Sequence, residues 1–86
     1  MKKEIEIAEY NINKGIQLSW ENNFKIEVSF RKGEVLIQAN KEGLYSLANH
    51  FLNLAQEKVP DYTHIHLDKY NSLEGDSVDL IVERIS

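Results

Sequence analysis

Phe24-Lys-Ile-Glu-Val-Ser-Phe-Arg31 alternates apolar with polar residues along its whole length. A period of two residues is typical of a β-strand with one buried face. Lys32-Gly33 then favours a turn, and the following run is apolar again at Val35, Ile37 and Ala39. The two runs predict an antiparallel hairpin, and we expect Val35, Ile37 and Ala39 to continue its inward side.

Two weaker alternations precede this hairpin. Ile5 and Ile7 alternate with polar residues from Lys3 to Ile7, and Ile16, Leu18 and Trp20 do so further on. We expect both segments to be strands of the same antiparallel meander.

The period changes after Asn40, which can cap a helix, with Glu42 favourably placed in the first turn. The helix should stop near Lys58, because the residue before Pro60 avoids helical geometry. Apolar residues at helical spacing predict the stripe that packs on the sheet. These residues are Leu44, Leu47, Ala48, Phe51 and Ala55, with Leu52, Leu54 and Val59 widening the stripe.

Two more strands are expected after the helix, at about Tyr62–Asp68 and Ser77–Ile85, joined by the long connection from Lys69 to Asp76. The predicted fold class is therefore α+β. We expect an antiparallel sheet of about five to six strands with one helix packed on one face, in the order β-β-β-β-α-β-β. Residues 1–86 should form a single domain.

Composition limits the function classes. The chain has 86 residues, no cysteine and a net charge of −4, without a basic patch, which disfavours nucleic-acid binding. No apolar run approaches the ~20 residues of a membrane helix, and the N-terminus lacks the apolar core of a signal peptide. We expect a cytoplasmic protein that binds neither membrane nor cofactor.

His64 and His66 raise the question of a metal site. Alternation puts Ile65 and Leu67 toward the helix and both histidines on the opposite face, where an H-x-H pair can chelate one ion. Asp68 is displaced along the strand, so Asp79 or Glu83 of the last strand would be the better third ligand if the two strands pair. The alternative is that these are polar residues on a solvated or partner-covered face. A small metal-binding protein, with or without hydrolytic activity, is the second hypothesis.

Other chemistry has no local signature in the sequence. The 68–76 segment lacks the ligand spacing of a calcium loop, and no serine lies in a nucleophile elbow. The four glycines are isolated, so there is no phosphate-binding loop. We therefore assign no catalytic residue.

The face opposite the helix is a candidate interaction surface, because apolar Leu36, Ile81 and Ile85 are mixed there with histidines and acids. A structural domain that pairs with a second copy through this face is a further possibility. The residues expected to contact a partner lie on this face and in the adjoining loop: Tyr62, His64, His66, Asp68, Tyr70, Asn71, Glu74, Asp79 and Glu83.

The second half of the chain resembles the immunity protein thirty-two family of bacterial polymorphic toxin systems. The resemblance covers about residues 44–85 and is carried by LANHFLNLAQ, HIHLD, NSLEGDS and DLIVER. It implies a non-enzymatic antitoxin that binds and blocks a cognate protein toxin in the cytoplasm. It also implies that HIHLD and NSLE are signature positions, for folding or for binding. Asn71 and Ser72 could cap the turn there, with Asp68 accepting its backbone N–H groups.

Overall fold

The computed structural model describes all 86 residues and confirms the central hairpin. Strand β1 (Ile26–Arg31) pairs with β2 (Glu34–Ala39) in unbroken antiparallel register, from Ile26 opposite Ala39 to Arg31 opposite Glu34. Lys32 and Gly33 both have positive φ, 52° and 79°, as the tight turn of a hairpin requires. The turn is thus as predicted. Val35 and Ile37, which were expected on the inward side, are exposed, and only Ala39 packs against the core.

A second hairpin follows the helix. Strand β3 (His64–Leu67) pairs antiparallel with β4 (Leu80–Glu83), so that His64 lies opposite Glu83 and Leu67 opposite Leu80. Both strands are shorter than predicted. Backbone hydrogen bonds between Thr63 and Arg84 and between Tyr62 and Arg84 extend the ladder past the strand ends.

The prediction of one sheet with five to six strands is wrong, because the strands form two separate two-stranded sheets. The long connection before β4 occupies the edge of β1 where a third strand would pair. The N–H groups of Glu74 and Val78 donate to the carbonyls of Ile26 (2.8 Å) and Val28 (2.9 Å). Val28 N–H donates to the Ser77 hydroxyl at 3.0 Å. The irregular connection before β4 therefore supplies hydrogen-bond partners to the free backbone groups of β1, and the two hairpins remain separate sheets.

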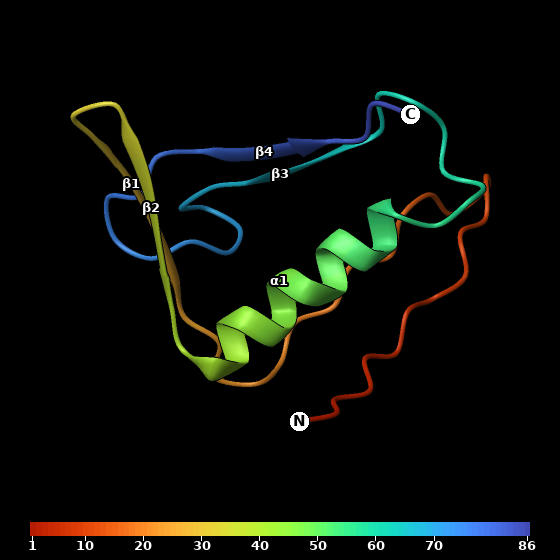
Figure 1. Cartoon of the computed structure of the whole chain (residues 1–86), viewed down its shortest axis with the longest axis horizontal. Coiled ribbons are helices and arrows are strands. Elements are labelled where there is room, and N and C mark those ends of the chain that lie inside the picture. Colours follow the sequence, from red (N-terminus) through yellow and green to blue (C-terminus); the bar gives the residue numbers. More distant parts are fainter.

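Helix α1 (Lys41–Leu54) lies beneath the second hairpin and starts where the sequence predicts (Figure 1). The Asn40 side chain accepts the Gly43 N–H at 2.8 Å, which makes it the N-cap. The helix ends before Lys58, the predicted end. The Arg84 guanidinium donates to the carbonyls of Leu54 and Gln56, at 2.7 Å each, and so satisfies backbone groups at the helix end.

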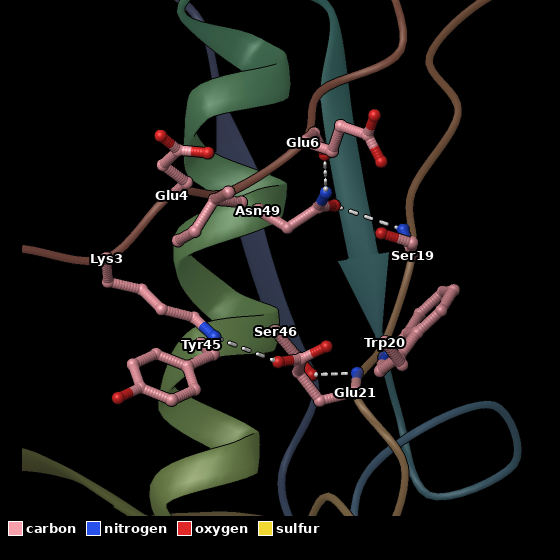
Figure 2. Close-up of a pocket in the computed structure, with 10 residues that line it drawn as sticks. Lys3, Glu4, Glu6, Ser19, Trp20, Glu21, Tyr45, Ser46 and Asn49 are labelled. Atoms are coloured by element: carbon pink, nitrogen blue, oxygen red, sulfur yellow. Dashed lines mark hydrogen bonds and ion pairs between the residues drawn. The ribbon is translucent and has the colours of Figure 1, made fainter.

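The two predicted N-terminal strands are absent. Both segments are extended, but the only strand pairing there is a single bridge between Asn11 and Gly15. The Asn49 side-chain amide lies between the segments, accepting from Ser19 N–H (3.0 Å) and donating to the Glu6 carbonyl (3.1 Å), as Figure 2 shows. A helix side chain thus takes the place of a neighbouring strand.

One more helix residue, and one just after the helix, hold the N-terminal half in the same way. The Ser46 hydroxyl accepts the Glu21 N–H at 2.8 Å (Figure 2). The Gln56 side chain accepts the Tyr10 N–H at 2.8 Å and donates to the Ala8 carbonyl at 3.2 Å. Because buried backbone groups need partners, this row of polar side chains is what attaches the first part of the chain.

The helix consequently buries a different face from the one predicted. Leu47 and Leu54 are buried, but Leu44, Phe51, Leu52 and Ala55 are exposed. Polar residues are buried in their place: Ser46, Asn49 and His50, which bind the N-terminal segments, and Asn53, which donates to Asn49. The apolar core forms where the helix meets both hairpins and the long connection, from Ile26, Val28, Leu47, Leu67 and Leu73.

His50 is fully buried among these polar residues. One ring nitrogen, Nε2, lies 3.1 Å from the Ser19 carbonyl, which makes it the protonated nitrogen of a neutral ring. The other, Nδ1, is buried without a hydrogen-bond partner, and Trp20 packs edge-on at 4.7 Å. Burial therefore lowers the pKa of His50 below 6.5, although its hydrogen bond to the Ser19 carbonyl acts in the opposite direction.

Because the unfolded chain binds this proton more readily, His50 should make stability depend on pH. Its contribution is complete above pH 6.5 and declines as the pH falls below that value toward the folded pKa. We expect urea unfolding to require less denaturant at about pH 5.5 than at about pH 7.5. In His50→Gln, which can still donate to Ser19, the difference should shrink. An equal pH dependence in both proteins would contradict the assignment.

Candidate functional site

The outer face of the second hairpin carries the histidines identified in the sequence. His64 and His66 of β3 are exposed, and Ile65 and Leu67 between them are buried, which confirms the predicted alternation. Their cross-strand neighbours on β4 are Glu83 and Ile81. Figure 1 shows the hairpin lying over α1, so this face is directed away from the helix. We call His64, His66, Asp79, Ile81 and Glu83 the β3–β4 face.

Acidic side chains fix the position of His66. Its Nε2 atom lies 2.8 Å from Asp79 Oδ2, a hydrogen bond, and 4.0 Å from Asp68 Oδ2. His64 makes weaker contacts, with its Nδ1 atom 3.9 Å from Glu83 Oε1 and 3.4 Å from the Tyr62 carbonyl. The two histidines share a face but have different acidic partners.

His66, Asp68 and Asp79 are the residues that could hold a metal ion. One donor atom from each lies within 4.8 Å of the others, and imidazole with two carboxylates suits a divalent cation. An ion would replace the hydrogen bond between His66 and Asp79. His64 lies outside this group. His66 and Asp79 are exposed, so the group lacks the dry surroundings that enzymes provide for metal chemistry.

The turn after β3 explains part of the signature stretch. Asp68 Oδ1 accepts the N–H groups of Tyr70 (2.9 Å) and Asn71 (3.1 Å). Asn71 Oδ1 accepts the Asp68 N–H (2.9 Å) and the Ser72 hydroxyl (2.6 Å), and its Nδ2 donates to the His66 carbonyl (3.0 Å). Asp68 and Asn71 therefore build the turn, and they hold the end of β3 rigidly beside Asp79.

The other predicted contact residues lie at different places. Tyr62 and Tyr70 are strongly exposed beyond the two ends of β3. Glu74 lies beside β1 instead, because its N–H donates to the Ile26 carbonyl. Ile81 is 58% exposed on the β3–β4 face opposite His66. The set of residues chosen from the sequence leaves out Ile81, although the alternation of the last strand places it there.

A pocket of about 390 Å³ lies between the N-terminal segment and the helix (Figure 2). Some of its lining side chains contact each other: Lys3 Nζ is 3.6 Å from Glu21 Oε1 and 4.3 Å from the centre of the Tyr45 ring. The pocket holds no nucleophile next to a base. It is the space left where an extended segment crosses a helix through side-chain contacts.

No curated protein and no solved structure matches the chain. No helix of the structure is long and apolar enough to cross a membrane. The model of one family, described as Immunity protein 32, matches residues 34–85, more than half of the chain. The matched residues contain β2, the helix, both strands of the β3–β4 face and the Asp68–Asn71 turn. The chain therefore belongs to the Immunity protein 32 family.

Proposed function

We propose that this protein is an antitoxin, which binds a cognate toxin domain in the cytoplasm of the producing cell and neutralises it without catalysis. Membership of the Immunity protein 32 family is the observation that carries this proposal. The structure is compatible with a binding role, because the β3–β4 face presents a mixed polar and apolar surface on a regular scaffold.

The β3–β4 face is the surface that we assign to the toxin. An exposed isoleucine, Ile81, lies beside His64 and His66, and the exposed Tyr62 lies just before β3. Interfaces commonly combine an apolar centre with aromatic and polar residues around it. The Asp68–Asn71 turn and the bond from His66 to Asp79 hold these groups in place, so binding costs little ordering entropy.

Charge indicates what kind of toxin surface fits. Asp68, Asp79 and Glu83 surround the histidines, and the whole chain has a net charge of −4. A basic patch on the toxin would complement this face and increase the association rate. Toxins that act on nucleic acids carry such patches, because they must bind phosphates.

Co-expression with the toxin encoded by the adjacent gene tests the proposal. We expect cells that carry both proteins to survive and the two proteins to purify as a complex. Mass spectrometry of the toxin released from that complex should show an intact, unmodified chain, which separates occlusion from enzymatic inactivation. A toxin that kills cells containing this protein at full expression, and that forms no complex with it, would refute the proposal.

A further inference from the structure

The β1–β2 hairpin has a surface that the proposed toxin contact leaves unused. The chain exposes 6487 Å², whereas a folded monomer of 10.0 kDa is expected to expose roughly 5,200 Å². The extended N-terminal segment accounts for part of the difference. Four large apolar residues on the hairpin also contribute, and they are between 39% and 62% exposed: Phe30, Val35, Leu36 and Ile37.

The outer edge of β2 has no partner. The hairpin lies at one end of the molecule, with its turn directed away from α1, and β2 pairs only with β1 (Figure 1). Free edges are normally protected by lysine, proline, a bulge or very short length. From Glu34 to Ala39 the strand has none of these, because the register is unbroken and the only charge is at its start.

The direction of the backbone groups at this edge follows from β1. The N–H and C=O of Val28 bind Ser77 and Val78, so they point away from β2. Ile37, directly opposite, must then point its own N–H and C=O to the free edge, and Val35 and Ala39 do the same by alternation. Val35, Ile37 and Ala39 thus offer a row of backbone donors and acceptors beside apolar side chains.

We propose that this edge binds a second copy of the chain, forming a two-fold symmetric dimer with a continuous β1-β2-β2-β1 sheet. Antiparallel pairing about Ile37 places Val35 opposite Ala39 of the second copy and makes about six backbone hydrogen bonds.

Charge supports a second copy as the occupant. In this register Glu34 of one copy lies opposite Asn40 of the other, next to Lys41. Each of the two equivalent ends of the pairing therefore brings an acidic side chain near a basic one. No charged side chain lies between Val35 and Ala39 of either copy. The acidic β3–β4 face belongs to the other hairpin and stays free.

Sedimentation velocity of the full chain tests the dimer between about 1 and about 200 µM, a range that brackets micromolar affinities. We expect wild type to form the dimer. In Val35→Lys and in Leu36→Lys we expect the dissociation constant of the dimer to be at least tenfold higher. Both side chains are at least half exposed, so the fold should tolerate lysine, which circular dichroism checks. The matched control is Ile81→Lys, which replaces an equally exposed residue on the β3–β4 face and should still dimerise.

Disulfide formation by a single introduced cysteine gives a second measurement, because the chain has no cysteine of its own. Cα atoms of a hydrogen-bonded antiparallel pair are about 5.5 Å apart, within the range of a disulfide. Ile37→Cys should therefore form a covalent dimer on mild oxidation, and Ile81→Cys should not. A monomer at every concentration, or a dimer that Ile81→Lys disrupts and both β2 variants leave intact, would overturn the proposal. The co-expression experiment tests toxin binding separately.

Discussion

Gly43→Ala should lower the free energy of unfolding by about 3 kcal/mol, at the upper end of the usual cost of overpacking and a large part of the stability of a small domain. This sign is the reverse of the usual one, because alanine in a helix is normally more favourable than glycine by about 1 kcal/mol. A Cβ atom on Gly43 would lie 2.4 Å from the backbone oxygen of Lys25. It would also meet Ile26 at 3.0 Å and Ala39 at 3.1 Å.

The obstructing atom belongs to the backbone just before β1, so it cannot rotate away as a side chain would. The first turn of α1 would have to move off the hairpin, and core packing between Leu47 and Ile26 would loosen with it. Urea unfolding followed by circular dichroism measures the effect.

Gly75→Ala is the matched control for this substitution. Gly75 has φ +57° and no atom within 4 Å of an added Cβ, so alanine there costs only the left-handed conformation, about 1 kcal/mol. A Gly43→Ala protein as stable as wild type would show that the helix does not pack this closely on β1.

Gly43 also shows what a sequence can and cannot reveal about this fold. Its position in the first turn is visible in the sequence, but its close contact with Lys25 exists only after the chain folds back. Local features were predictable for the same reason: the Lys32-Gly33 turn, the Asn40 cap and the alternation of His64 to Leu67 depend on neighbouring residues alone.

The N-terminal half was mispredicted because alternation indicates an extended segment and not its partner. The segments around Ile5 and Leu18 are extended, yet their hydrogen-bond partners are Asn49, Ser46 and Gln56 of the helix and the chain just after it. The spacing of apolar residues takes no account of such polar side chains, so it predicted that Leu44 and Phe51 would be buried, whereas both are exposed. Which residues become the hydrogen-bond partners of an extended segment depends on contacts with residues far away in the sequence.

The candidate site was likewise predictable only in its local features. Pairing of β3 with β4 follows from two alternating runs, and it places His64 and His66 on one face. The contact between His66 and Asp79 does not follow, because the long connection must first bend around Asp68 and Asn71. The sequence therefore identifies the strand but not which acid each histidine binds.

If the β3–β4 face binds the toxin, reversing its charge should abolish protection. The double variant Asp79→Lys, Glu83→Lys replaces the acids that contact His66 and His64. We expect the dissociation constant for the toxin to increase about 100-fold or more, because two favourable contacts become repulsive and the encounter slows. Surface plasmon resonance at low and high salt measures both effects, and the loss should be larger at low salt.

Glu27→Lys, Glu57→Lys is the matched control, because it changes the net charge of −4 by the same amount through exposed residues elsewhere. It should slow association only slightly and keep cells protected. If both double variants weaken binding equally, then overall charge and not this face governs recognition. If the control weakens binding more, the toxin binds another surface. Loss confined to the Asp79, Glu83 variant would place the toxin against His64, His66 and Ile81, on the face that the two alternating strands create.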